Sequence, residues 1–209
     1  MITHEDKINA LISSSERLFR LYFKQCTAPD LDTLFNFLNA LHSFQDKFEK
    51  AGLGSFYEVP EFIALKTIRN LFHHHVELMS EVRIIPAQDL PPINTDLLYL
   101  CLVHRRLIEE ALLRLPKNHK AQGEAMTKAA FNWHGEIIDI NPCIFNFMVE
   151  AYEQLRRNDI ELSTEEFEGF PSSYTYEEGN GYSHKITGTL FCHASSIEKV
   201  LEKVFSPIK

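Results

Sequence analysis

The sequence predicts an all-α protein, an up-and-down helical bundle with a C-terminal appendage. Along residues 1–158, apolar side chains recur at intervals of three and four, and proline or glycine stands near the ends of several of these segments. Residues 159–209 differ, because they begin with an acidic stretch and continue with a segment rich in Ser, Thr, Tyr and Gly. Because 209 residues suffice for one sizeable core, we expect the appendage to pack on the same domain as the bundle.

Six helices are expected in the bundle from apolar spacing and boundary residues. They cover about residues 5–25, 29–52, 60–82, 95–115, 118–133 and 142–157. Pro60 suits the first turn of the third helix, where a backbone N–H has no partner within the helix. Asn94 or Thr95 can cap the fourth helix. The run from Leu97 to Val103 is apolar nearly all round, so this helix is expected at the centre of the bundle.

The appendage is expected to contain an acidic loop, a small β-hairpin and a short helix. Residues 170–192 are rich in Ser, Thr, Tyr and Gly, and Asn180-Gly181 is a turn signal. A hairpin is therefore assigned to this segment, with a mobile acidic loop as the alternative. Residues 195–205 have the apolar spacing of a short helix that closes the chain.

The formal net charge of −8 disfavours a nucleic-acid partner, because phosphate contacts need a positive surface. The charge is unevenly distributed, however. Residues 159–178 hold seven acidic residues and no Lys or Arg, so they account for most of the net charge. The segment 104–120 is mainly basic, and Arg105 and Arg106 are weak candidates in it for contacts with RNA phosphates.

Several classes of protein are disfavoured by what the sequence lacks. The four cysteines are scattered and form no CxxC pair, which argues against a zinc ribbon or a thioredoxin-type site and suits a reducing cytoplasm. No secretory signal is evident and the longest apolar run is too short to span a bilayer, so we expect a cytoplasmic protein without membrane contact. The absence of a Gly-rich phosphate loop and of a G-x-S-x-G elbow disfavours NTPases and serine hydrolases.

The expected third helix carries three consecutive histidines, which a helical wheel separates. His75 falls on the broad apolar face and is expected to pack in the core. His73 lies on the polar side with Arg69 and Asn70, and His74 lies towards one margin. His73 and His74 are therefore expected to reach solvent.

The groups on this polar side suit chemistry on a phosphodiester. Arg69 and His73 are four residues apart, as are Asn70 and His74, so each pair stacks one turn above the other. A guanidinium can bind a phosphate through a planar fork of donors and offset the charge that develops in the transition state. An imidazole titrates near neutrality and can move a proton at a ribose 2′-hydroxyl or at the leaving oxygen.

The sequence Arg69-Asn70, three further residues and His74 resembles the R-N-x-x-x-H motif of the HEPN superfamily, small helical domains many of which are RNA-cleaving toxins. The resemblance implies a HEPN-like bundle, an active site at a homodimer interface, and RNA cleavage that needs no metal or other cofactor. Arg69 would bind and stabilise the phosphate, His74 would transfer a proton, and Asn70 would orient these groups. His73 matches no position of the motif, and we include it as an auxiliary group on our own inference. A toxin or defence role would add an antitoxin or another protein partner.

Two plainer interpretations of the same residues stay open. The polar side could be a solvated helix face that pairs with Glu77 or other acids, as charged helix faces usually do. The protein would then be a non-catalytic helical module that binds a protein or a nucleotide. His73 and Glu77 could also supply two metal ligands, but the sequence offers no evident third, so we expect no metal site.

Overall fold

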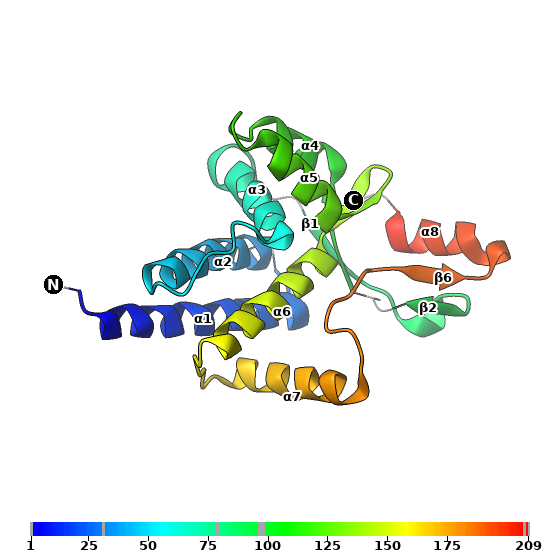
Figure 1. Ribbon diagram of the computed structural model, residues 1–209. Helices are drawn as coiled ribbons and strands as arrows, with labels where there is room; N and C mark the ends of the chain where they lie inside the picture. Colours follow the sequence, from blue (N-terminus) through cyan, green and yellow to red (C-terminus); the bar gives the residue numbers. More distant parts are fainter. Residues whose placement is uncertain (1, 31, 78–79, 96–98, 207, 209) are drawn as a thin grey trace.

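The computed structural model describes residues 2–30, 32–77, 80–95, 99–206 and 208. Within these ranges the chain is mostly helical and adds short antiparallel strands (Figure 1). The helices are α1 (His4–Thr27), α2 (Thr33–Lys50), α3 (Pro60–His74), α4 (Arg105–Leu113), α5 (Lys120–Ala130), α6 (Asn141–Arg157), α7 (Glu165–Asn180) and α8 (Ile197–Phe205). The strands are β1 (Ser80–Ile84), β2 (Ile93–Thr95), β3 (Tyr99–His104), β4 (Asn132–His134), β5 (Ile137–Asp139) and β6 (Leu190–Cys192). The predicted predominance of helix is confirmed, but most strands lie outside the appendage to which the sequence assigns a hairpin.

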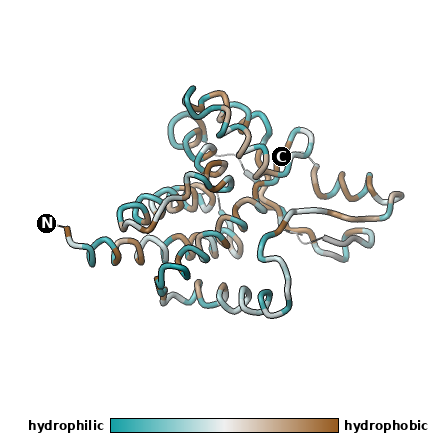
Figure 2. The backbone as a smooth tube through the Cα atoms, viewed as in Figure 1, coloured by the Kyte–Doolittle hydropathy of each residue, from teal (hydrophilic) through white to brown (hydrophobic). Residues whose placement is uncertain are grey.

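The first two helices form an antiparallel hairpin, and both agree with the predicted segments within a few residues (Figure 1). A capping box starts α1: the Asp6 backbone N–H donates to Thr3 Oγ1 at 3.1 Å, and the Thr3 N–H donates to Asp6 Oδ2 at 2.8 Å. Along α1 and α2 the tube in Figure 2 alternates between teal and brown. This alternation is typical of helices with one buried face.

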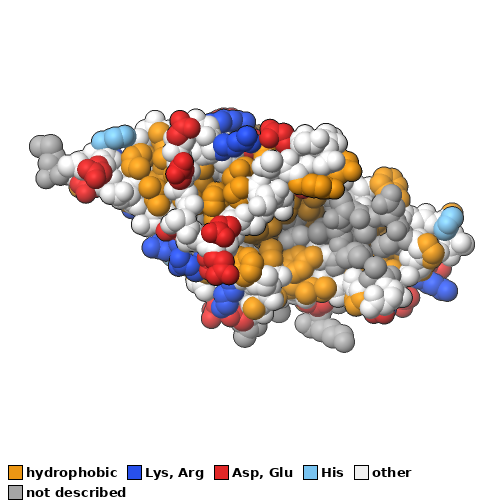
Figure 3. Space-filling view, turned by 90° about the horizontal axis from the view of Figure 1, so that it is seen from below, with side chains coloured by type: hydrophobic (Ala, Val, Ile, Leu, Met, Phe, Trp, Pro, Cys, Tyr) orange, Lys and Arg blue, Asp and Glu red, His pale blue; other side chains and the backbone are white. Residues whose placement is uncertain are grey.

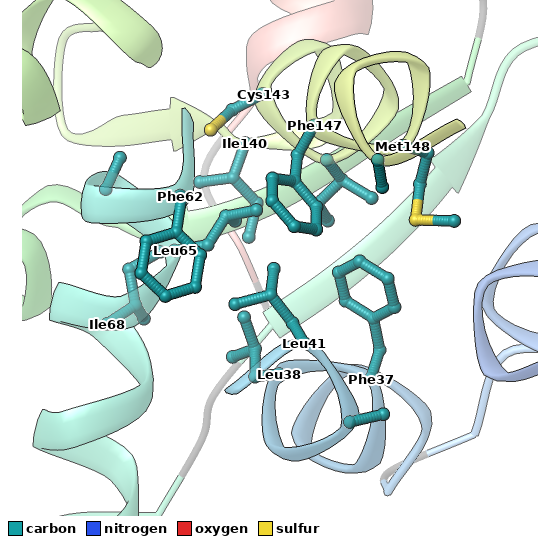
Figure 4. Packing of buried hydrophobic residues seen from close by; sticks show 14 of the residues in the cluster. Phe37, Leu38, Leu41, Phe62, Leu65, Ile68, Ile140, Cys143, Phe147 and Met148 are labelled. Carbon is teal, nitrogen blue, oxygen red and sulfur yellow. The ribbon is translucent and has the colours of Figure 1, made fainter. Parts of the chain in front are cut away.

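The main core lies where α2, α3 and α6 meet. Phe37 and Leu41 of α2, Phe62 of α3 and Phe147 of α6 are fully buried. Figure 4 shows these side chains pointing toward one another between the three helices. Burial of a side chain of this size contributes roughly 1.5–3 kcal/mol, so the core holds α3 firmly against α2.

Strand β3 is the centre of a four-stranded sheet with the order β1-β3-β5-β4. Cys101 and Val103 face the main core, whereas Leu100 and Leu102 belong to a second apolar cluster on the opposite face of the sheet. A strand buried on both faces has no polar alternation, so its sequence looks like a wholly buried helix. The predicted central helix at residues 95–115 is therefore wrong: β3 occupies its first part, and α4 begins only at Arg105.

Three other predicted boundaries change for related reasons. Asn94 and Thr95 lie in β2, so neither caps a helix, and residues 96–98 lie outside the described ranges. Helix α5 ends at Ala130 instead of about residue 133, because β4 follows directly. Strands β4 and β5 form a hairpin across Gly135, whose φ of +58° suits a two-residue turn.

Residues 165–180 form helix α7, so the assignment of residues 170–192 to a hairpin or acidic loop is wrong for this part. Its aromatic side chains anchor it: Phe167 and Phe170 pack edge-on against Phe19 of α1, with ring centroids 4.9 and 5.5 Å away. Gly181 ends the helix with φ +69°, so Asn180-Gly181 marks a helix end and not a hairpin turn. The sequence hides this helix because it contains Pro171 and packs through only a few side chains.

The C-terminal helix α8 was expected at residues 195–205 and is found at Ile197–Phe205. Val200 and Val204 bury against the second face of the sheet with Leu102. Strand β6 pairs with β2, far back in the chain, and Figure 1 shows this pair beside α8. None of the helices in the described ranges has the length and hydropathy needed to cross a membrane.

Candidate functional site

The histidine segment lies at the C-terminal end of α3, which is shorter than predicted. The helix ends at His74, and the N–H groups of His75 and Val76 both donate to the Leu71 carbonyl, at 2.9 and 3.3 Å. His75 is exposed, so its predicted place in the core is wrong: the wheel assumes a helix that continues to residue 82, whereas β1 begins at Ser80. His73 and His74 are exposed, as the wheel predicts.

Arg69 is half-buried between α2 and α3 and is held by neutral oxygens. Its Nε donates to Asn39 Oδ1 at 3.1 Å, and its Nη1 donates to Asn70 Oδ1 at 3.4 Å. No carboxylate of the described residues forms an ion pair with it. Since a guanidinium has five N–H donors, donors remain for an anionic ligand, and its charge is not neutralised locally.

The two exposed imidazoles lie together beside this guanidinium. The ring centroids of His73 and His74 are 4.6 Å apart in an edge-on contact. His73 also stacks on Phe35 of α2, with centroids 6.4 Å apart and planes at 12°. The positive charge of Arg69 is the main cause that lowers the pKa of His73, with smaller contributions from desolvation and His74. The lowered pKa favours the neutral form of His73, which can accept a proton.

Helix α2 supplies a row of residues to the site that the sequence prediction misses. Phe35, Asn39, His42 and Asp46 follow one another at intervals of four, three and four, which places them on one helix face. His42 Nδ1 lies 3.6 Å from Asp46 Oδ2. Burial is the main cause that lowers the pKa of His42; Asp46 raises it, and Arg69 and Lys66 lower it further. The spacing on α2 is the signal in the sequence, but nothing there indicates that this face meets α3.

Lys66 extends the cationic cluster one turn before Asn70. Its Nζ lies 4.3 Å from the centroid of the Tyr57 ring. Burial is the main cause that lowers its pKa, Asp46 raises it, and Arg69 lowers it. Lys66 and Arg69 thus place two cations close together in an acidic protein, with Asp46 as the nearby acid. On the face shown in Figure 3, acidic and basic side chains are interspersed instead.

A cleft of about 480 Å³ opens beside the motif, between α3 and α5. Lys66 and Asn70 line its α3 side, and His119 and Gln122 line its α5 side. Asn70 therefore belongs both to this cleft and to the Arg69 cluster. The Gln122 amide donates to Glu58 Oε2 at 3.4 Å across one edge of the cleft.

Arg105 and Arg106 lie on α4 and do not line the cleft beside the motif. The Arg105 guanidinium pairs with Glu109 Oε1 at 2.8 Å and lies 5.7 Å from the Trp133 ring centroid. It lines a different cleft, which shares no residue with the cleft at Asn70. Arg106 is exposed on the first turn of α4.

The potential metal ligands do not gather here. In the described ranges no three His, Cys, Asp or Glu side chains are grouped so that they could hold a metal ion. Glu77 lies after the end of α3, so it does not follow His73 on the next helical turn. A metal site that uses this pair as adjacent helical ligands is therefore not formed.

Comparison of the chain with protein-family models, curated proteins and solved structures gives no match. The site is therefore interpreted from its own geometry. That geometry combines an arginine that no carboxylate of the described residues neutralises, two exposed imidazoles and an adjoining cleft.

Proposed function

We propose that this protein is a HEPN-like, metal-independent endoribonuclease. The observation that carries the proposal is Arg69, a half-buried guanidinium held by the amide oxygens of Asn39 and Asn70 beside the exposed rings of His73 and His74. An arginine that merely stabilised the fold would usually be paired with a carboxylate. One held by neutral acceptors keeps charge and donors for a phosphate.

The proposed reaction is an intramolecular transesterification of a phosphodiester in the RNA chain. A ribose 2′-oxygen attacks the adjacent phosphorus, the bond from phosphorus to the 5′-oxygen of the next nucleotide breaks, and the products are a 2′,3′-cyclic phosphate and a 5′-hydroxyl. Arg69 offsets the negative charge that builds on the phosphoryl oxygens. His74 moves a proton at the 2′-oxygen or the leaving oxygen, and His73, whose lowered pKa favours the neutral form, is the auxiliary acceptor. Asn70 orients the guanidinium.

The site is proposed to be completed by a second copy of the chain. One α3 helix offers one guanidinium and two imidazoles, and pairing two copies across a two-fold axis doubles this set. The resemblance of the motif supports a homodimer of this kind. It also supports a cytoplasmic toxin or defence role in which an antitoxin-like partner covers the site.

The test is cleavage of a labelled RNA in the presence of EDTA. We expect cleavage by the wild type, and a loss of at least about 100-fold in both Arg69→Ala and His74→Ala. Arg106→Ala and His75→Ala are matched controls, because they remove the same side-chain types from exposed positions: Arg106 lies on α4, outside the cleft beside the motif, and His75 follows the end of α3. Equal thermal unfolding of all variants separates a chemical loss from misfolding.

Two results would overturn the proposal. Cleavage that survives both motif substitutions would assign the activity to a contaminant or to another site. Cleavage that EDTA abolishes and a divalent cation restores would make the reaction metal-dependent. A size measurement adds a check on the assembly, because a strict monomer with full activity would dismiss the shared site.

The alternative is a non-catalytic module that binds a nucleotide through the same helix face. It is favoured by one observation, the cleft that shares Asn70 with the Arg69 cluster. Nucleotide binding without any cleavage would select this alternative.

A further inference from the structure

The geometry points to the cleft between α3 and α5 as the site of a nucleoside next to the scissile phosphate. This inference rests on the proposed function, since it takes RNA as the substrate. It adds where a base next to the scissile phosphate would bind, and a preference for cytidine over uridine. The cleft residues Tyr57, Glu58, Lys66 and Gln122 lie outside the resemblance to the HEPN motif.

The first step is the placement of the cleft along α3. Lys66, Asn70 and His74 follow one another at intervals of four, so they form one row down the helix, with a rise of about 6 Å per interval. The row begins inside the cleft, passes Asn70 in its wall and ends at an exposed imidazole. A nucleoside in the cleft would thus have its phosphate close to Asn70, whose Oδ1 accepts from Arg69.

The second step is the fit between the cleft and a nucleoside. A volume of about 480 Å³ lies within the range of about 300–1,000 Å³ that is typical of small-molecule sites. Ile63 and Leu115 line it with apolar surface, and Tyr57 is 37% exposed. A base has flat apolar faces, for which an accessible aromatic ring is the usual stacking partner. The Lys66 ammonium lies 4.3 Å from the centroid of the Tyr57 ring, so a base that stacks there must displace it, and the displaced ammonium supplies charge for the backbone.

The third step is the polar edge of the cleft. Glu58 and Gln122 line one edge of the cleft and are joined by a 3.4 Å hydrogen bond in which Glu58 Oε2 accepts, so the carboxylate keeps lone pairs for a ligand. A carboxylate accepts from the exocyclic amino group of cytosine, which uracil replaces with a carbonyl oxygen. The proposed site therefore prefers cytidine to uridine.

Two other clefts suit a nucleotide less well because of their charge and location. The cleft at Arg105 has its cation paired with Glu109 and shares no residue with the motif. The groove between α1, α6 and α7 is lined by Glu165, Glu166 and Glu177, which would repel a phosphate.

The experiment titrates cytidine 3′-monophosphate and uridine 3′-monophosphate into the full chain and follows the backbone amide signals by NMR. We expect the largest signal changes around Tyr57, Asn70 and Gln122. Cytidine 3′-monophosphate should bind about tenfold more tightly than the uridine compound. Lys66→Met should weaken both by about tenfold, whereas Lys120→Met, which removes a lysine of α5 outside the cleft, should leave both unchanged.

Glu58→Gln is the sharper variant, because Glu58 is exposed and its replacement keeps the size of the side chain. It should reduce the preference for cytidine while leaving uridine binding unchanged. Equal binding of both compounds by the wild type, or equal effects of Lys66→Met and Lys120→Met, would overturn the inference. Because mononucleotide binding needs no RNA cleavage, loss of the nuclease proposal and loss of the nucleoside site are separate results.

Discussion

Arg69 on α3 and Arg105 on α4 show how differently two arginines behave in one fold. Both stand out in the sequence as candidates for contact with RNA phosphates. Arg105 lies on the surface and is ion-paired with Glu109 one turn away, whereas Arg69 is half-buried and, among the described residues, bonds to the amides of Asn39 and Asn70. The difference teaches that the acceptor beside an arginine, more than local charge density, decides whether its charge is available to a ligand.

The largest expected effect sharpens this comparison directly. Arg69→Ala should lower the rate of RNA cleavage by about 10³-fold, because it removes the cation that offsets charge in the transition state. Arg105→Ala should lower it by no more than about twofold. Single-turnover kinetics on one RNA measures both, and a comparable loss in the two variants would contradict the distinction.

Asp139 is the opposite case, a buried acid that forms no ion pair with a base of the described residues. Its Oδ1 accepts the N–H groups of Cys101 and Asn141, both at 3.0 Å, yet burial prevails and raises its pKa to about 7. The folded state therefore binds a proton that the unfolded chain has released between about pH 4 and 7, so this group stabilises the fold less as pH rises through that window. Asp139→Asn should reduce the change of the free energy of unfolding with pH, by up to about 4 kcal/mol between pH 4 and 8. Urea unfolding of both proteins at several pH values measures it, and parallel curves would argue against a shifted carboxyl.

A third prediction tests whether a carboxylate beside Arg69 makes its charge less available to a ligand. Asn39→Asp places an acid against the Arg69 guanidinium and makes it resemble Arg105. We expect kcat/KM for RNA to fall by about tenfold or more with no loss of thermal stability, because the new ion pair competes with the phosphate. Glu109→Gln is the reciprocal change: it frees Arg105 and should raise affinity for RNA only slightly, with the motif intact. Unchanged kinetics in Asn39→Asp would mean that Asn39 does not govern the charge at the site.

The smallest effect is electrostatic and needs no substrate. Because Arg69 is the main cause that lowers the pKa of His73, Arg69→Met should raise that pKa toward the ordinary value of histidine. NMR titration of the imidazole protons measures it directly. His4, which lies at the start of α1, serves as an internal reference, and an identical displacement of both histidines would point to a general change and not to the removed cation.

Much of the helical framework could be predicted, because its signals are local. Apolar spacing locates α1, α2, α6 and α8 within a few residues, and Pro60 marks the start of α3. The sheet could not be predicted in this way, since β3 is buried on both faces and has no strand alternation. Helix α7 escapes because it depends on aromatic contacts with α1, which lies about 150 residues earlier in the chain.

The candidate site could also be predicted only in part, since its local geometry follows from the sequence and its long-range contacts do not. The outward placement of His73 and His74 follows from helix geometry alone, and the structure agrees. His75 fails because its environment depends on where α3 ends, which long-range packing decides. Asn39 and Phe35 could not be assigned to the site from sequence, because a contact across thirty residues requires knowledge of how α2 meets α3.

Because Arg69 on α3 donates a hydrogen bond to Asn39 on α2, the position of its guanidinium depends on how the two helices pack. The direction of the guanidinium depends on the angle between α2 and α3. Phe44, Phe48 and Phe56 pack against one another near the C-terminal end of α2 and help to set this angle. A smaller side chain at one of these buried positions would leave a cavity, lower the free energy of unfolding and let α2 shift against α3. If the protein cleaves RNA as proposed, such a change in the core would lower the rate of cleavage by displacing Arg69, although the substitution lies far from the site.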